Sequence, residues 1–110
     1  RLVHRHDIQV QETKKQVVVS WTVTNDGDEN AKDVVLDLPQ LNESYPLSKD
    51  LAPKTDGRHE MTIPFDRLKI REKGEYALIY RVLYKDANFY PFSAPYVAMI
   101  LLPPAPSRGL

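Results

Sequence analysis

Apolar and polar side chains alternate one by one along most of this chain. The clearest stretch is residues 16–25, where four large apolar side chains share one face and mostly smaller or polar ones share the other: Val17, Val19, Trp21 and Val23. A strand repeats its faces every two residues and a helix every three to four, so this pattern predicts a half-buried β-strand. Trp21 is the largest of the four, and we expect it in the core.

Similar alternation recurs at intervals that are typical of a β-sandwich. It predicts strands over residues 7–12, 32–38, 58–65, 74–85 and 89–101, and a short edge strand near 47–51 within a loop covering 40–57. Turns are expected at residues 25–28 and 86–88, which are rich in Asn, Asp and Gly or in Asp and Asn. Pro91 and Pro95 each remove a backbone donor, which favours an edge position or a bulge for the last strand.

No segment has a helical period, so the pattern predicts an all-β, seven-stranded, antiparallel sandwich. The chain has 110 residues, enough for one domain. We expect an N-terminal extension over residues 1–6, the sandwich over 7–101, and a proline-rich linker over 102–110, within a longer protein. The absence of cysteine excludes disulfides, thiolate zinc sites and cysteine nucleophiles, and leaves the redox compartment open.

The balance of charge and the lengths of the apolar runs exclude some classes of partner. Fifteen basic and fifteen acidic residues give a formal charge of zero, so no overall field attracts nucleic acid or anionic lipid. The longest apolar run, residues 96–102, is far shorter than the roughly twenty residues that span a bilayer. We therefore expect no nucleic-acid partner and no membrane insertion by this segment.

Two local motifs resemble those of immunoglobulin-like sandwiches that lack the inter-sheet disulfide. One is the strand and turn of residues 17–27 followed by the Ala-Lys-Asp-Val-Val-Leu of residues 31–36, and the other is the Lys-Gly-Glu-Tyr that ends at Tyr76. Both are similar to fibronectin-like modules and to bacterial adhesion-related (CARDB-like) domains. The resemblance implies a tyrosine corner, with the Tyr76 hydroxyl bonded to the backbone a few residues upstream. It also implies a periplasmic or cell-surface location, which includes the ectodomain of a membrane protein.

Histidines and carboxylates supply two candidate metal sites. His4 and His6 would share one strand face, and His59 would have to approach them to complete a site. Two ligands alone bind weakly, so we expect no metal and no cofactor there. Acidic residues gather in residues 26–33, and Asp66 and Asp86 would join them only if loops converge. This turn fits either calcium ligands or, as we favour, a turn that bonds to its own backbone.

Basic residues recur at every second position between residues 67 and 73: Arg67, Lys69, Arg71 and Lys73. In an extended segment they would form a stripe for an anionic polymer or lipid head group. No aromatic rings are interleaved with them, so a solvated connection between strands is the favoured interpretation. Residues 42–44 also fit a glycosylation sequon, which matters only in a secretory eukaryotic context.

Aromatic residues are dense in the last predicted hairpin. We expect most of them in the core and some outside, with Tyr90, Phe92 and Tyr96 as the candidate interaction residues and Trp21 and Tyr76 as the structural core. No serine–histidine pair, apolar carboxylate pair or glycine-rich loop indicates catalysis, so we do not expect an enzyme. The sequence favours a non-catalytic structural or protein-interaction module that contacts neighbouring domains or another protein. The alternative is a carbohydrate- or ligand-binding accessory domain that uses the exposed rings of this hairpin.

Overall fold

The structure is a computed structural model that describes residues 1–103. These residues form seven strands and no α-helix: β1 (Leu2–Gln11), β2 (Gln16–Asn25), β3 (Ala31–Leu38), β4 (Glu43–Leu51), β5 (Asp56–Pro64), β6 (Gly74–Lys85) and β7 (Pro91–Leu102). Two 3-10 turns, η1 (Pro39–Leu41) and η2 (Phe65–Leu68), follow β3 and β5. The prediction of an all-β, antiparallel chain without cysteine is confirmed.

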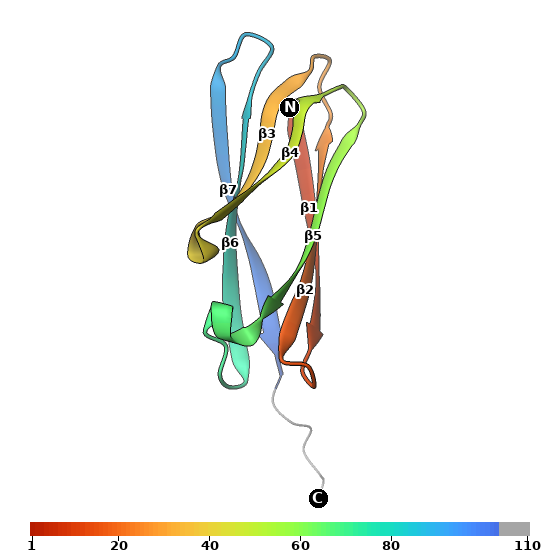
Figure 1. Ribbon diagram of the computed structural model, residues 1–110. Helices are drawn as coiled ribbons and strands as arrows, with labels where there is room; N and C mark the ends of the chain where they lie inside the picture. Colours follow the sequence, from red (N-terminus) through yellow and green to blue (C-terminus); the bar gives the residue numbers. More distant parts are fainter. Residues whose placement is uncertain (104–110) are drawn as a thin grey trace, which may run out of the picture.

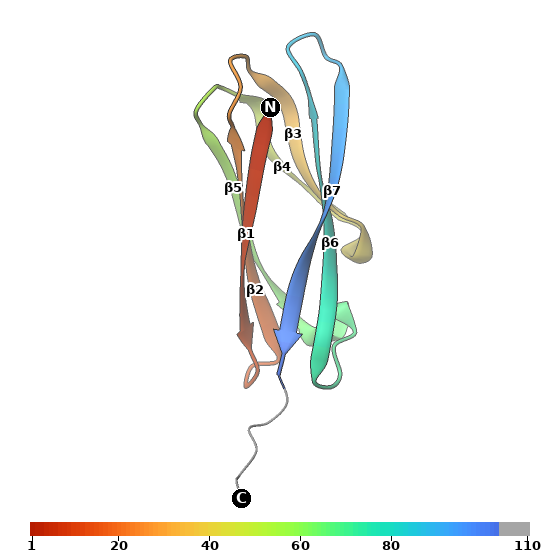
Figure 2. The same cartoon turned by 180° about the vertical axis from the view of Figure 1, so that it is seen from behind.

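The strands form two antiparallel sheets that face each other. One has the order β1-β2-β5 and the other β4-β3-β6-β7. The two layers run along the long axis of the molecule. Strands β4 and β5 lie toward the viewer in Figure 1, and β1 and β7 lie toward the viewer in Figure 2. The loops after β2, β4 and β6 lie at one end, together with Arg1. The β1–β2 turn and η2 lie at the opposite end.

The core lies between these sheets and follows the alternation in the sequence. On β2 every second side chain is buried, including Trp21 at 1% exposure. The inward side chains of the opposite sheet are also buried, among them Leu36, Leu78, Tyr80 and Ile100. Burying each large apolar side chain contributes about 1.5–3 kcal/mol relative to exposure, so this layer accounts for most of the stability of the fold.

Two strands are longer than the sequence indicates. β1 begins at Leu2 and not near Asp7, because Leu2 already pairs with Asn25, and the residues expected as an extension form half of the strand. β4 covers nine residues where we expected a short strand near 47–51. It contains Pro46, which is tolerated because β4 is the edge of its sheet. The edge position expected for the proline-bearing last strand is confirmed for β7.

Other boundaries also differ. The strand expected over 58–65 is β5 at 56–64, and Phe65 begins η2. β7 starts at Pro91 and extends to Leu102, the first residue of the expected linker. Residues 104–110 of that linker lie outside the described residues.

β6 extends beyond its pairing with β3, and a side chain takes the place of the missing strand. The pairing of β3 with β6 ends where Asp37 pairs with Arg81. Beyond it, Gln40 of η1 donates from Nε2 to the carbonyl of Ala77 at 2.9 Å. Its Oε1 accepts the backbone N–H of Ile79 at 2.6 Å. The amide therefore satisfies a donor and an acceptor on the β3-facing edge of β6.

Candidate interaction surfaces

The loop between β6 and β7 is closed by the backbone and side chain of Asp86. The N–H of Phe89 donates to the Asp86 carbonyl at 2.9 Å, and the N–H of Asp86 donates to the Tyr90 carbonyl at 3.0 Å. The Asp86 carboxylate accepts the N–H groups of Asn88 and Tyr90, both at 2.9 Å. These bonds confirm the hairpin turn expected at residues 86–88, and they hold the loop in one conformation.

Phe89 occupies an unusual position in this loop. Its φ of 63° is left-handed, and it is the last residue of the turn that its N–H closes to the Asp86 carbonyl. A turn followed by one left-handed residue is a common hairpin connection, and glycine usually fills the left-handed position. A phenylalanine there is strained, because its Cβ crowds the backbone. Its ring is 63% exposed, so little burial offsets that strain.

Two of the three predicted interaction residues accompany Phe89 at this end of the molecule. Tyr90 is 68% exposed and Phe92 is 45% exposed. The Phe92 ring stacks on Tyr84 of β6, with centroids 5.1 Å apart, and its centroid is 6.2 Å from that of Tyr90. The hairpin therefore presents a cluster of partly supported aromatic rings to solvent.

The third predicted residue, Tyr96, does not face outward as we expected. It is half-buried between the sheets, where its ring lies 3.4 Å from the His4 ring and 5.6 Å from the Tyr80 ring, centroid to centroid. The reason is the period of the strand, which gives Tyr96 the same face of β7 as the buried Ala98 and Ile100.

The outward face of β6 and β7 carries an apolar surface that the sequence reasoning did not identify. We call it the outer apolar strip, and it consists of side chains between 40% and 56% exposed: Ile79, Val97, Met99 and Leu101. Ile79 pairs directly with Val97 across the two strands. The available signal was the apolar run of residues 96–102, in which both faces are apolar.

The three histidines do not form one site. His4 and His6 do share a strand face, and the Nδ1 atoms of both lie at hydrogen-bonding distance from the Tyr80 hydroxyl, at 2.8 and 3.0 Å. His59 lies on the other side of Trp21 and stacks on Tyr45 at 4.2 Å between centroids. Within residues 1–103, no group of three or more His, Cys, Asp or Glu side chains is placed to hold a metal ion.

Burial shifts the pKa values of three of these rings, those of Tyr80, His4 and His59. It raises the pKa of Tyr80 to about 12, with a further contribution from Tyr96. Burial also lowers the pKa of His4, with a smaller contribution from the charge of His6, and it lowers the pKa of His59. The neutral forms are therefore favoured, and the Tyr80 hydroxyl connects β6 to the first half of β1.

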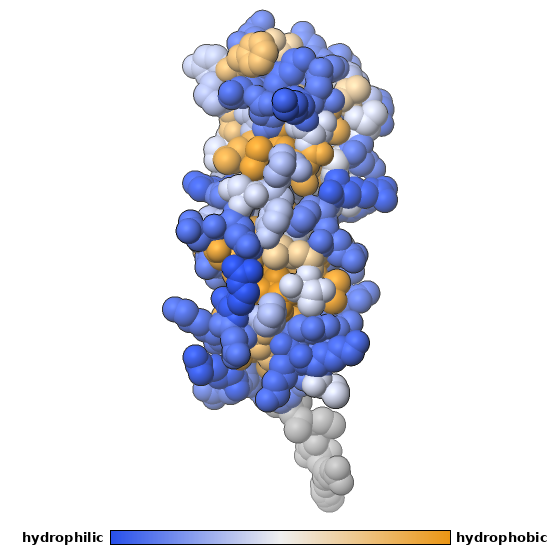
Figure 3. Space-filling model, viewed as in Figure 1, coloured by the Kyte–Doolittle hydropathy of each residue, from blue (hydrophilic) through white to orange (hydrophobic). Residues whose placement is uncertain are grey.

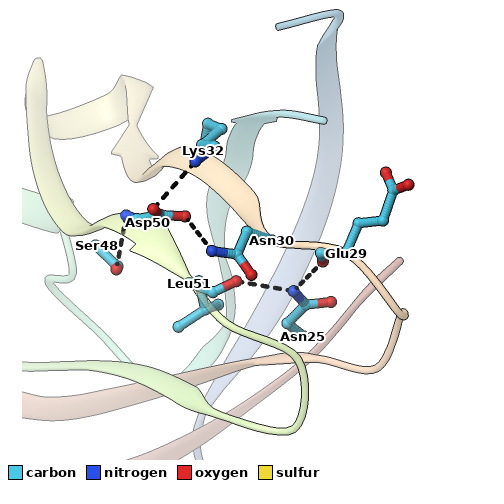
Figure 4. Close-up of polar contacts among 7 residues, drawn as sticks. All are labelled: Asn25, Glu29, Asn30, Lys32, Ser48, Asp50 and Leu51. Carbon is cyan, nitrogen blue, oxygen red and sulfur yellow. Dashed lines mark hydrogen bonds and ion pairs between the residues drawn. The ribbon is translucent and has the colours of Figure 1, made fainter. Parts of the chain in front are cut away.

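Asn25 organises the acidic turn after β2 (Figure 4). This residue is fully buried, and its Nδ2 donates to the carbonyls of Glu29 at 2.7 Å and Leu51 at 2.8 Å. Its Oδ1 accepts the N–H of Gly27 at 2.9 Å. One side chain thus holds the turn and ties it to the end of β4, which agrees with the interpretation that this turn bonds to its own backbone.

The carboxylates of the turn have separate partners. Asp26 forms an ion pair with Lys54 at 3.2 Å, and Asp33 pairs with Lys85 at 3.5 Å. Both pairs are exposed, so each contributes little to stability.

The basic residues between 67 and 73 do not form the stripe that an extended segment would give. Phe65–Leu68 is a 3-10 turn, and Lys69 has a left-handed φ of 58°. Arg67 pairs with Glu43 at 3.1 Å, and Lys73 pairs with Glu12. The favoured interpretation, a solvated connection between strands, is confirmed, because residues 65–73 link β5 to β6. The connection is held by a turn in which the N–H of Ile70 bonds to the Phe65 carbonyl at 3.0 Å.

This segment lines a pocket at the end of the molecule opposite the β6–β7 hairpin. The pocket has a volume of about 530 Å³ and is bounded by the β1–β2 turn, η2 and the end of β7. Buried apolar side chains line its interior (Phe65, Ile70 and Leu102), and charged side chains such as Lys15 and Arg71 line its rim.

Tyr76 makes the hydrogen bond that the resemblance implied. Its hydroxyl donates to the carbonyl of Glu72, four residues upstream, at 2.6 Å. The side chain is half-buried and packs against the core, whereas Trp21 lies within it. The predicted corner contact is confirmed, and it fixes the entry into β6.

Comparison with known proteins assigns no family. No protein-family model matches the chain, and no curated protein matches it. In the part of the chain that the structure describes, no helix has the length and apolarity needed to cross a membrane. The function is therefore inferred from the fold and the surfaces described above.

Proposed function

We propose that the chain is an immunoglobulin-like, fibronectin-like module that serves as a non-catalytic interaction unit of a larger extracytoplasmic protein. The sheet order supports this class, because β4 pairs with β3 and not with β5, unlike the fourth strand of a constant-type immunoglobulin domain. The hydrogen bond from Tyr76 to Glu72 also supports it. In this role the sandwich is a rigid body that holds a contact with a neighbouring domain or another protein.

The observation that carries the proposal is the outer apolar strip. Its four side chains are contiguous, about half exposed, and lie on the edge strand β7 and its neighbour. Contiguous apolar surface of this kind marks contact sites more often than solvated faces. An edge strand also leaves the backbone N–H and C=O groups of one side without a neighbouring strand, and a strand of a partner can pair with them. A protein partner is therefore expected to cover β7 and the strip beside it.

Hydrogen exchange in the parent protein tests this function. We expect the β7 amides to exchange more slowly in the full-length protein than in the isolated module, because a partner covers them there. Met99→Lys is expected to abolish that protection while leaving the isolated module folded, since Met99 is 53% exposed. Thr62→Lys is the matched control, because Thr62 is an exposed residue of β5, in the other sheet. Equal β7 exchange rates in both contexts contradict the proposal.

Carbohydrate binding by the hairpin is the second candidate function. It is favoured by the exposed rings of Tyr90 and Phe92, since aromatic faces stack on sugars. A glycan array is expected to give a signal that Tyr90→Ala removes. An array without signal excludes this candidate and leaves the first untouched.

A further inference from the structure

The two ends of the molecule carry opposite charge, although the whole chain is neutral. The loops after β2, β4 and β6, with Arg1 beside them, form what we call the tip end. It has four acidic side chains (Asp26, Asp28, Glu29 and Asp86) and two basic ones (Arg1 and Lys54). The opposite end, formed by residues 12–15 and 65–73, has six basic and three acidic side chains. Figures 1 and 2 show these ends at the two extremes of the long axis.

The tip end carries an apolar projection. Phe89 and Tyr90 are the most exposed large apolar side chains of residues 1–103, and Asp86 holds their loop by four hydrogen bonds. In Figure 3 a hydrophobic group stands among hydrophilic residues at this end. Phe89 remains in a left-handed position that glycine fills better, and its burial within the molecule does not offset that strain. The exposed ring is therefore better explained by contact with another molecule.

The opposite end carries the complementary shape. Its pocket of about 530 Å³ lies within the range of about 300–1,000 Å³ that is typical of sites enclosing a ligand. The interior is apolar, from Phe65, Ile70 and Leu102. Three basic and three acidic side chains also line the pocket, so the net positive charge belongs to this end as a whole: Lys15, Arg71, Lys73, Glu12, Asp66 and Glu72. An aromatic projection fits such a pocket in apolarity, and the net negative charge of the tip end complements the net positive charge of the end that holds the pocket.

We propose that copies of this chain associate end to end, with Phe89 and Tyr90 of one copy seated in the pocket between residues 12–15 and 65–73 of the next. The acidic tip end then faces the more basic end of its neighbour, which steers and orients the contact. The two surfaces differ, so the contact is heterologous and produces open chains in place of closed dimers. The contact rests on two side chains and one pocket, so we expect a small interface and weak association.

Sedimentation velocity of the 110-residue chain at about 0.1–1 mM tests the proposal, a range suited to small interfaces. We expect species that grow with concentration beyond a dimer, and that dissociate when salt rises from about 0.05 to 0.5 M, since screening weakens exposed charges. The tip variant is Phe89→Gly with Tyr90→Ser. The pocket variant is Lys15→Glu with Arg71→Glu, because both side chains are exposed and neither forms an ion pair within residues 1–103.

Each variant alone is expected to be monomeric, and an equal mixture is expected to form one-to-one dimers, because it retains one intact tip and one intact pocket. Phe89→Gly is also expected to raise Tm, which separates loss of contact from loss of folding. The proposal is overturned if the wild-type chain stays monomeric. It is also overturned if the tip variant still associates, or if the mixture of the two variants forms no dimers. Association that Met99→Lys removes and the tip variant spares also overturns it, and assigns self-contact to the outer apolar strip of the proposed function.

Discussion

Replacing Asn25 by alanine removes three hydrogen bonds at the end of β2. The Leu51 carbonyl that Asn25 binds belongs to a buried residue, so water does not readily replace the lost donor. The carbonyl of Glu29 and the N–H of Gly27 are only partly buried and recover some bonding to water. An unsatisfied buried group costs about 1–3 kcal/mol, and an average hydrogen bond contributes about 1 kcal/mol. Asn25→Ala is therefore expected to lower the free energy of unfolding by about 2–4 kcal/mol, a large part of the 5–15 kcal/mol typical of a domain.

Urea unfolding followed by tryptophan fluorescence measures this loss. Trp21 is the single tryptophan and is 1% exposed, so its emission reports the opening of the core. We expect the midpoint to fall by about 1–3 M at unchanged m, since m is about 1–3 kcal/mol/M for small proteins. A smaller loss at unchanged m contradicts the role given to Asn25.

Asn30→Ala is the matched control. Its Nδ2 makes one exposed hydrogen bond, to Asp50 at 2.7 Å, so we expect a loss below about 1 kcal/mol. Asn25→Asp keeps an acceptor for the N–H of Gly27 but loses both donors and buries a charge, and it is expected to destabilise at least as much as Asn25→Ala. Equal losses for Asn25→Ala and Asn30→Ala refute the reasoning.

Three further predictions follow from the core and its edges. Tyr76→Phe removes the hydrogen bond to the Glu72 carbonyl and is expected to cost about 1 kcal/mol in urea unfolding, and no change contradicts a structural corner. Tyr80→Phe deprives both His4 and His6 of their shared partner, so the amides of residues 2–6 are expected to exchange faster while those of β5 do not. Because burial lowers the pKa of His4 and of His59 below their ordinary 6.5, the unfolded chain takes up protons first as the pH falls. The contribution of these two neutral histidines to the free energy of unfolding is thus full above about pH 6.5 and falls at lower pH. Urea midpoints that rise as the pH is lowered from 7.5 to 5.5 contradict this prediction.

The alternation of side chains predicts the central strands well because it directly reflects which face is buried. β2 and β6 match their predicted ranges, and Trp21 lies in the core as expected. The first half of β1 escaped prediction because its inward residues His4 and His6 are polar, and their partner, Tyr80, is distant in sequence. Residues 67–73 also alternate, with basic side chains at every second position, and the interpretation of this segment as a connection between strands is confirmed.

The candidate surfaces were predictable only in part. The exposure of Tyr90 and Phe92 could be predicted, because many aromatic rings follow a turn there. The orientation of Tyr96 could not, because it depends on which face of β7 meets the other sheet. Both faces of residues 96–102 are apolar, so the sequence does not distinguish the core from the outer apolar strip. The pocket at the end opposite the tip is built from separate segments that only the fold brings together.

The amide of Gln40 has a consequence for how the protein avoids misassembly. An unprotected stretch of strand edge recruits strands from other molecules and starts edge-to-edge growth of fibres. Because Gln40 already occupies the Ala77 carbonyl and the Ile79 N–H, an invading strand meets a blocked register at the middle of the stretch that β3 leaves open. Gln40 thus protects the edge of β6 in the part where β6 continues and its neighbour β3 has ended.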